Sequence, residues 1–184
     1  MTPKLRSLIR NTGVFILVTS FLIVGNGCVQ TPEERFQKRG TQYLYKRMYD
    51  EAIVEFNKAI QINPISVNSY LMRRNAYAMK GKFEEAISDY SKAIEIEPYI
   101  AEAYNNRGNV YANKGNFDQA ILDFSKAIEI NPKFAEAYTN RSRAYFSKQE
   151  YSKSWEDVNK VEELGGRLHP QFLEDLKKAS GREK

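Results

Sequence analysis

Three prolines in the middle of this 184-residue chain, Pro64, Pro98 and Pro132, follow one another at intervals of 34 residues. A fixed period of roughly 20 to 50 residues indicates an array of repeated supersecondary units, which bury their apolar faces against their neighbours. We therefore divide the chain into consecutive frames of one period each. The frames cover residues 33–66, 67–100, 101–134 and 135–168.

Several positions of these frames carry the same kind of side chain in most or all of them. Positions 4 and 11 are aromatic throughout, position 24 is aromatic in three frames, and positions 20 and 27 are alanine in three. Agreement in so many columns excludes a chance spacing of prolines. The residues are Phe36, Tyr70, Tyr104 and Tyr138 at position 4; Tyr43, Tyr77, Tyr111 and Tyr145 at position 11; Ala52, Ala86, Ala120 and Ser154 at position 20; Phe56, Tyr90, Phe124 and Val158 at position 24; and Ala59, Ala93, Ala127 and Val161 at position 27.

The spacing within a frame predicts two helices joined by a tight turn. Positions 4, 7, 8 and 11 share one face of a helix, and positions 20, 24, 27 and 28 share a face of a second helix. Alanine at positions 20 and 27 lets the two helices approach closely, and the aromatic side chains fill the remaining space. Gly81 and Gly115 at position 15 are expected to end the first helix in a left-handed conformation. Proline at position 32 cannot continue the second helix, so it ends the hairpin.

These columns resemble the tetratricopeptide repeat (TPR), which has an aromatic residue at position 4, glycine at 8, tyrosine at 11, alanine at 20 and 27, and proline at 32. The resemblance covers residues 33–164. It implies an all-α solenoid of four helix-turn-helix repeats, wound as a right-handed superhelix whose concave face is lined by the first helix of each repeat. Members of this family bind peptides or protein surfaces.

The fourth frame loses the pattern in its second helix, and glycines replace its proline. Terminal repeats are expected to be atypical because they cap an exposed core. We therefore expect residues 169–184 to form a C-terminal capping helix, packed on the fourth hairpin, and a polar tail from Ser180. We interpret His169, beside the start of this helix, as a loop residue rather than as a ligand or a base.

One feature is added to the generic repeat: every frame has arginine at position 7 and an acidic residue at position 23. We predict an ion pair that ties the first helix of each hairpin to the second. The alternative is a row of surface charges, which contribute little to stability. Lysine at position 14 and acidic residues at position 18 are interpreted as partners of the helix dipoles. The four predicted pairs are Arg39 with Glu55, Arg73 with Asp89, Arg107 with Asp123 and Arg141 with Asp157.

Residues 1–27 have the layout of an export signal. They contain three cations and no acidic residue, and an apolar run from Val14 to Val24 is followed by small residues. A helix of that run would be about 16 Å long against a hydrocarbon core of about 30 Å, which favours a cleaved signal over a permanent span. Ordinary secretion and an uncleaved signal anchor are the alternatives.

The only cysteine, Cys28, directly follows this segment and resembles the lipobox cysteine of bacterial lipoproteins. In such proteins a signal peptidase cuts before a cysteine that becomes acylated, and two or more acyl chains give stable anchoring. Gly25 and Asn26 depart from the usual lipobox residues. The resemblance implies lipidation of Cys28, a linker over residues 28–32 and a lipid-anchored location in the bacterial cell envelope. Val29, where an aspartate would favour the inner membrane, indicates the outer membrane facing the periplasm, with the inner membrane as the alternative.

The net charge of +5 first suggests an affinity for nucleic acid or anionic membranes. However, residues 1–27 contain three of the 28 cations and none of the 23 acidic residues, so the net charge after them is +2. Residues 28–164 contain 20 cations and 20 acidic residues. The repeats are therefore electrically balanced, and we expect no nucleic-acid partner.

The sequence also argues against catalysis and against a metal centre. One cysteine and one histidine are too few for a structural zinc site of the usual cysteine and histidine ligands. The chain has no phosphate-loop, HExxH, CxxC or G-x-S-x-G motif. We predict a protein that is not an enzyme and that has no cofactor, metal or small-molecule substrate. The alternative is a subunit of an enzyme whose catalytic residues lie on another chain.

The TPR resemblance places partner contacts mainly at positions 2, 5, 6, 9, 12 and 13 of the first helices. Here these positions are rich in asparagine, whose amide both donates to and accepts from a peptide backbone, although asparagine also occurs there in generic TPR sequences. We expect no carboxylate clamp of the chaperone-binding kind, because Leu71, Glu136 and Asn140 stand where its cations belong. The candidate contacts are Gln37, Thr41, Tyr45, Leu71, Asn75, Met79, Asn105, Asn106, Asn109, Asn113, Asn140 and Arg143.

The predicted function is therefore a non-enzymatic scaffold or adaptor that binds a protein or peptide and is held at a membrane by lipid on Cys28. The alternative is a signal-anchored TPR receptor or assembly factor of the inner membrane.

Overall fold

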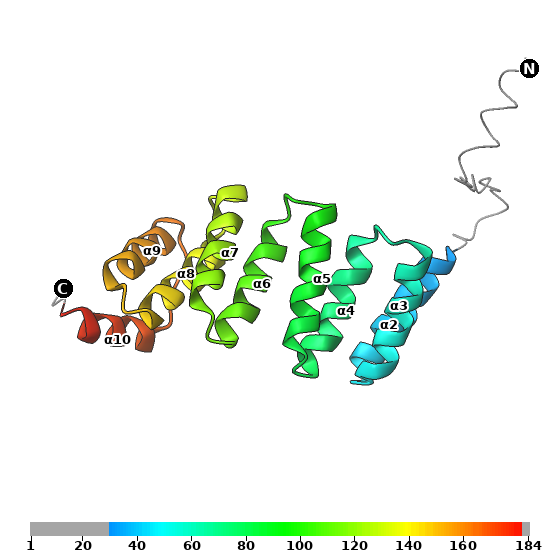
Figure 1. Ribbon diagram of the computed structural model, residues 1–184. Coiled ribbons are helices and arrows are strands. Elements are labelled where there is room, and N and C mark those ends of the chain that lie inside the picture. Colours follow the sequence, from blue (N-terminus) through cyan, green and yellow to red (C-terminus); the bar gives the residue numbers. More distant parts are fainter. Residues whose placement is uncertain (1–29, 182–184) are drawn as a thin grey trace, which may run out of the picture.

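The computed structural model describes residues 30–181, and within this range the chain forms nine α-helices and no strand. Consecutive helices pair into hairpins, α2 with α3, α4 with α5, α6 with α7 and α8 with α9, and α10 packs on α9. The hairpins stand side by side in chain order, so the molecule is an elongated stack (Figure 1). The expected all-α array of four hairpins and a capping helix is confirmed. The helices are α2 (Pro32–Tyr45), α3 (Tyr49–Ile62), α4 (Val67–Met79), α5 (Phe83–Ile96), α6 (Ala101–Asn113), α7 (Phe117–Ile130), α8 (Ala135–Ser147), α9 (Tyr151–Glu163) and α10 (Pro170–Ser180).

The first helix begins inside the segment that we expected to be a linker. The Thr31 hydroxyl accepts a hydrogen bond from the Glu34 amide, and the Glu34 carboxylate accepts one from the Thr31 amide. Pro32 is the first helical residue, because its fixed φ suits the first turn and its missing N–H would have no partner there. The linker predicted at 28–32 is therefore too long by one residue at this end. Cys28 and the signal predicted at 1–27 lie outside the described residues.

All four hairpins turn through the same left-handed position. Gly81 and Gly115 have φ values of 70° and 77°, which confirms the conformation predicted for both. The equivalent residues in the first and fourth hairpins are Arg47, with φ of 58°, and Gln149, with φ of 64°. A side chain is strained there because its Cβ crowds the backbone. The turn is therefore set by the packing of the hairpin and not by glycine alone.

The core runs along the stack as a column of small and aromatic side chains. The alanines at positions 20 and 27 of the first three hairpins are 0% exposed, which allows the two helices of each hairpin to lie close together. Phe56 and Phe124 are also 0% exposed and press against Gly40 and Gly108 of the facing helices. A Cβ atom on Gly108 would lie 2.7 Å from Cε1 of Phe124. Glycine at position 8 therefore accompanies phenylalanine at position 24.

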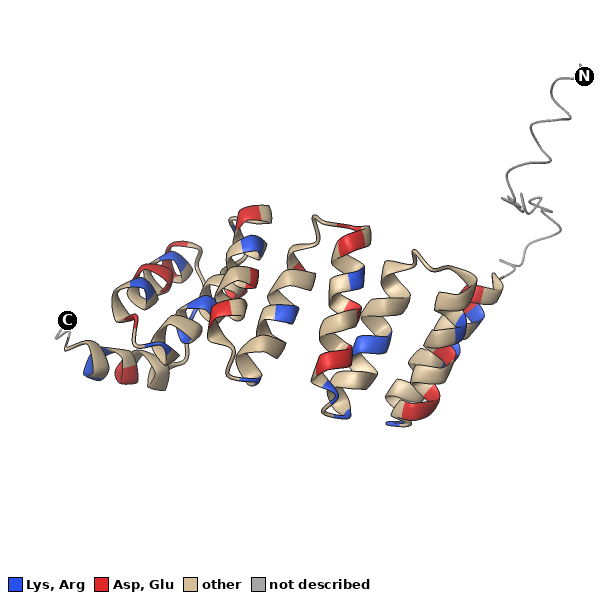
Figure 2. Ribbon diagram, viewed as in Figure 1, with Lys and Arg blue, Asp and Glu red and all other residues tan. Residues whose placement is uncertain are grey.

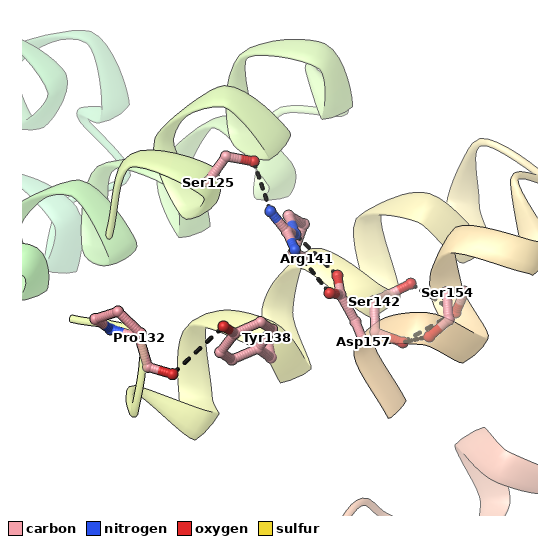
Figure 3. Close-up of polar contacts among 7 residues, drawn as sticks. All are labelled: Ser125, Pro132, Tyr138, Arg141, Ser142, Ser154 and Asp157. Atoms are coloured by element: carbon pink, nitrogen blue, oxygen red, sulfur yellow. Dashed lines mark hydrogen bonds and ion pairs between the residues drawn. The ribbon is translucent and has the colours of Figure 1, made fainter. Parts of the chain in front are cut away.

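The fourth hairpin replaces this glycine and one alanine with two buried serines. Ser142 and Ser154 are both 0% exposed. The Ser142 hydroxyl donates to the Ser154 carbonyl at 3.0 Å, and the Ser154 hydroxyl donates to the Ser142 carbonyl at 2.9 Å (Figure 3). These reciprocal bonds satisfy both hydroxyls, as buried polar groups require. The departure from the repeat pattern is thus compensated within the hairpin.

Helix α10 covers the C-terminal end of the stack, as predicted. Leu176 is 0% exposed and lies in an apolar cluster with Tyr138, Val158 and Val161 of the fourth hairpin. Phe172 packs against the same cluster. The apolar face of the last hairpin is therefore closed by a helix that belongs to no repeat.

Two polar residues define the ends of α10. His169 caps its N-terminus, since its Nδ1 accepts a hydrogen bond from the Gln171 amide, which agrees with the structural role expected for this histidine. The tail predicted from Ser180 begins one residue later, because Ser180 is the last helical residue. Its hydroxyl accepts a hydrogen bond from Trp155 Nε1 at 3.1 Å, which ties the end of α10 to α9.

Candidate protein-binding face

The arginines at position 7 join the helices of one hairpin and also join neighbouring hairpins. Arg107 donates two parallel hydrogen bonds to the Asp123 carboxylate, from Nε and from Nη2, both at 2.8 Å. Its remaining nitrogen, Nη1, donates to the Ser91 hydroxyl of the preceding hairpin at 2.9 Å. Hydrogen bonding to Asp123 raises the pKa of the Arg107 guanidinium, so this side chain stays charged. The predicted ion pair is confirmed in every hairpin.

Figure 3 shows the same arrangement around Arg141, which contacts Asp157 of its own hairpin and Ser125 of the preceding one. Beside it, the Tyr138 hydroxyl donates to the Pro132 carbonyl at 3.3 Å. In the second to fourth hairpins the acidic side chains are at most 9% exposed and the arginines 17–19%. The alternative of a row of surface charges therefore does not hold for these three hairpins. Because one largely buried arginine bonds both to its own hairpin and to the preceding one, these contacts fix the spacing between hairpins.

The lysines at position 14 make a second contact between neighbouring hairpins. In the second to fourth hairpins this lysine pairs with the acidic residue at position 18 of the preceding hairpin, 30 residues earlier in the chain. From the sequence, we interpreted the lysines and the acidic residues as partners of the helix dipoles. The structure shows that they also form ion pairs with each other. The acidic partners are 74–76% exposed, so each pair is worth less than about 1 kcal/mol. Charges of both signs consequently lie on every hairpin (Figure 2). The pairs are Lys80 with Asp50, Lys114 with Glu84, and Lys148 with Asp118.

The first helices form the face on which the candidate contacts were predicted. Tyr45 and Met79, in the last turns of α2 and α4, are 86% and 63% exposed. Asn75 and Asn106, in α4 and α6, are half-buried. Two large apolar side chains are therefore open to solvent at equivalent places of the first two hairpins.

Three other candidates are engaged by the chain itself. The Gln37 side chain donates to the Ser69 hydroxyl of the second hairpin at 2.9 Å. The Thr41 hydroxyl donates to the Gln37 carbonyl of its own helix at 2.8 Å. Leu71 packs against the core cluster that contains Ile87. Gln37 joins two hairpins, Leu71 packs on the core and Thr41 bonds within its own helix, and a role for these residues in partner contacts stays a prediction.

Four of the remaining candidates meet at an open hollow of about 510 Å³ between the third and fourth hairpins. Asn109 and Asn113 reach it from α6, and Asn140 and Arg143 reach it from α8. Small and aromatic residues supply its apolar lining. The residues around the hollow are Asn109, Ala112, Asn113, Phe117, Phe124, Asn140, Arg143, Ala144 and Ser147.

Asn105 supports this hollow instead of lining it. Its side chain is 1% exposed, and its Oδ1 accepts a hydrogen bond from Asn140 Nδ2 at 3.0 Å. Its own Nδ2 donates to Glu136 Oε1 at 3.2 Å. Asn105 therefore does not lie on the exposed surface as we expected, because the neighbouring first helix covers it. The network fixes the orientation of the Asn140 amide, so that the Asn140 side-chain oxygen can accept a hydrogen bond from a partner.

Arg143 is the cation of the hollow. Its side chain is exposed, and no ion pair of residues 30–181 includes it. The guanidinium lies 5.9 Å from the centre of the Phe172 ring of α10, where a cation is attracted to the aromatic face. An arginine with free donors can bind a carboxylate or a peptide carbonyl. Together with the asparagine amides, it gives the hollow both donors and acceptors.

Sequence reasoning missed the apolar part of the hollow. Phe117 belongs to position 17, which is aromatic in every frame, and this signal was not among the columns compared above. Phe124, predicted as a core residue, is indeed 0% exposed and lies beneath the hollow. The part of the chain that the structure describes has no group of three or more histidine, cysteine or acidic side chains arranged for a metal ion. No helix in that part has the length and apolar character needed to cross a membrane.

A stack of like helix hairpins, each tied to the one before it, defines an α-solenoid. The sequence of the repeats identifies the class of α-solenoid. Family profiles described as "Tetratricopeptide repeat" match residues 36–66 and 101–134, and one described as "TPR repeat" matches residues 75–115. The chain belongs to the tetratricopeptide-repeat family.

Solved structures show the same fold. Two crystal structures of MamA match with TM-scores of 0.69 and 0.67 and sequence identities of 28% and 26%. They cover 72% and 83% of this chain, and 78% of each matched chain. The first TPR of Spaghetti (RPAP3), bound to the HSP90 peptide SRMEEVD, matches with a TM-score of 0.57 and 28% identity over 62% of this chain and 90% of its own. No protein with a curated description matches the sequence. Family and fold define a protein-binding scaffold.

Proposed function

We propose that the chain is a non-enzymatic adaptor that holds a peptide or protein segment on the face of its first helices, with the hollow between α6 and α8 as the anchoring point. The observation that carries this proposal is the meeting of Asn109, Asn113, Asn140 and Arg143 around an apolar lining. Binding sites combine apolar surface with a few placed polar groups in this way. The peptide-bound TPR among the similar structures supports a peptide as the class of ligand.

The chemistry of the hollow favours an extended segment. Asparagine amides pair with the N–H and C=O groups of a peptide backbone, and Phe117 supplies apolar contact for a side chain of that peptide. Arg143 favours a carbonyl or an acidic side chain beside it. The carboxylate clamp that we excluded from the sequence is not proposed, since Leu71 packs in the core and Glu136 bonds to Asn105.

We further propose that lipid on Cys28 holds the adaptor in the bacterial cell envelope, at the outer membrane facing the periplasm in preference to the inner membrane. The export-like layout of residues 1–27 and the single cysteine after it support this location. The second candidate is an inner-membrane receptor or assembly factor whose signal segment stays uncleaved, which the same apolar run supports.

Peptide selection on the full chain tests the binding site. Peptides selected from a random library on the immobilised protein, then labelled, are titrated by fluorescence anisotropy. We expect Arg143→Ala and Asn109→Ala each to weaken binding at least about fivefold, equivalent to roughly 1 kcal/mol. Lys133→Ala, an exposed cation outside the hollow, serves as the matched control. Selected peptides that bind all three variants as well as the unaltered chain would overturn the site.

Palmitate labelling tests the anchor. We expect the unaltered chain to incorporate the label and to fractionate with membranes, and Cys28→Ser to lose both. An unlabelled chain whose Cys28→Ser variant is equally membrane-bound contradicts lipidation and favours the signal anchor. A chain found only in the soluble fraction contradicts both.

A further inference from the structure

The outer face of α2, at the N-terminal edge of the stack, meets no other helix within residues 30–181. Its residues occupy positions i, i+3, i+4, i+7 and i+11 of one helical face, all are exposed, and none is acidic. A hollow of about 480 Å³ lies along it and is also lined by Gln30, Pro32 and Phe36. We call this surface the N-terminal edge. It consists of Arg35, Lys38, Arg39, Gln42 and Lys46.

The three junctions inside the array show what such a face normally meets. The arginine at position 7 donates through Nη1 to position 25 of the preceding hairpin, and the lysine at position 14 pairs with the acid at position 18. Both acceptors lie on one helix, seven residues or two turns apart, and therefore on one face. The acceptor pairs are Asp50 with Asn57, Glu84 with Ser91, and Asp118 with Ser125.

At the N-terminal edge, no such helix faces these donors within the part of the chain that the structure describes. The Arg39 side chain is 53% exposed, against 17–19% for its three equivalents. Arg39 Nε lies 2.8 Å from Glu55 Oε2, yet the parallel pair of hydrogen bonds is not formed, and this buried oxygen has no hydrogen-bond partner. Lys46 is exposed and forms no ion pair within residues 30–181. The N-terminal edge therefore resembles an internal junction from which the preceding hairpin is missing.

The edge is also adapted to an apolar neighbour. Position 4 is Phe36, whereas Tyr70 and Tyr138 at this position donate to a proline carbonyl of the preceding hairpin. Phe36 lies under the Arg39 guanidinium, 4.8 Å from the ring centre. A partner that covers this ring needs apolar surface but no carbonyl to accept a hydroxyl.

A second copy of the chain does not offer the complementary helix. The last hairpin has Ser152 at position 18, where the internal junctions have an acid, and α10 covers its apolar end. The helices of this chain that carry both acceptors, α3, α5 and α7, are used in its own junctions. Residues 1–29 contain no acidic residue that could pair with Lys46, and no unused helix within residues 30–181 carries both acceptors, which points to another protein as the occupant of the edge.

We propose that the N-terminal edge docks an amphipathic helix of a partner protein that carries a carboxylate and, seven residues later, a hydroxyl or amide side chain. Lys46 pairs with the carboxylate, Arg39 Nη1 donates to the hydroxyl or amide, and the Phe36 ring packs against the apolar face of the helix. This surface is separate from the hollow between α6 and α8, so either site can fail without the other. The array then binds two partners, one on its inner face and one on its end.

The direct experiment uses the full chain in detergent and a labelled synthetic hairpin with the sequence of residues 67–98, which contains Glu84 and Ser91 in the required register. We expect saturable binding in fluorescence anisotropy. Lys46→Ala should weaken it about threefold to fivefold, in line with an ion pair of up to about 1 kcal/mol. Glu84→Gln in the probe should cost as much, and the two losses should not add, because they remove the same pair. Lys133→Ala is the control and should bind as the unaltered chain does.

A chain in which residues 67–100 are duplicated directly ahead of Glu33, so that the 34-residue period is kept, tests the same contact if the synthetic hairpin does not fold. There Lys46→Ala should lower the melting temperature, while in the natural chain it should not. Three outcomes overturn the proposal: no binding by a helical probe, equal binding by the Lys46→Ala variant, or an equal effect of Lys46→Ala in both chains. Lys46-dependent binding to vesicles with anionic lipid, or a Lys46-dependent dimer in ultracentrifugation, would assign the edge to a membrane or to a second copy instead.

Discussion

Arg107 and Asp123 are 16 residues apart in the chain and meet through two parallel hydrogen bonds of 2.8 Å, while the third nitrogen of Arg107 bonds to Ser91 of the hairpin before. One guanidinium therefore closes a hairpin and sets its distance from the neighbouring hairpin. The carboxylate is buried, with 9% of its side chain exposed. Removing it leaves a charged group without its counter-ion in a partly dry environment, which is costly.

We expect Asp123→Ala to lower the free energy of unfolding by about 3–5 kcal/mol, because it leaves Arg107 uncompensated. Asp118→Ala should cost less than about 1 kcal/mol, since Asp118 is 75% exposed and pairs with Lys148 at the surface. Denaturant unfolding followed by circular dichroism measures both. Equal and small losses would show that the buried pair is not a main source of stability.

Gly108→Ala should destabilise the protein by about 1–3 kcal/mol, because the new Cβ would lie 2.7 Å from Cε1 of Phe124 and 3.2 Å from the Ala120 carbonyl oxygen. The same substitution in a Phe124→Val background should cost clearly less, as the serine and valine of the fourth hairpin suggest. Thermal melts of the four proteins in this cycle give the coupling. Identical costs in both backgrounds would rule out the contact with the ring as the cause.

Arg47→Gly and Gln149→Gly should each stabilise the chain by about 0.5–1 kcal/mol, because both residues have positive φ and glycine relieves the strain of a side chain there. Gly115→Ala should have the opposite sign and a similar size. A Cβ at Gly115 meets nothing within 4 Å, so any loss is conformational. Denaturant midpoints compare the three variants, and a Gly115→Ala protein as stable as the parent would contradict the explanation.

Tyr90 should make the protein sensitive to alkali. Its side chain is 1% exposed, and burial raises its pKa to about 12, although the Arg74 guanidinium above the ring opposes the shift. The folded state therefore holds this proton more tightly than the unfolded state, whose tyrosine titrates near 10. The stability linked to Tyr90 is complete below pH 10 and is lost as the pH rises from about 10 to about 12, by up to about 3 kcal/mol.

The free energy of unfolding, measured at several values from about pH 9 to about pH 12, tests this linkage. The Tyr90→Phe variant should lose less stability over this range than the unaltered chain. Tyr99→Phe, at a position 83% exposed, is the control and should follow the unaltered chain. Parallel curves for all three proteins would contradict the effect assigned to Tyr90.

Much of the fold follows from contacts within one hairpin, and these could be predicted. The repeat columns predicted that Ala120 lies between the two helices of its hairpin and that Gly115 lies in the turn. Both positions follow from helical spacing over a few residues. The pairing of Arg107 with Asp123 was also predicted, since two columns that recur together in every frame must serve one local contact. For the candidate site, the repeat positions led to Asn109 and Arg143, which the hollow brings together.

What the repeat period could not reveal is how one hairpin meets the next. Nothing in a single frame indicates that Lys114 reaches Glu84, that Arg107 has a third bond to Ser91, or that Asn105 is covered. These contacts depend on the rotation and distance between neighbouring hairpins, which result from packing over residues about 30 apart. The amino-acid order therefore specifies each unit through its short-range spacing. The stacking of the units decides which polar side chains become structural and which stay open to a partner.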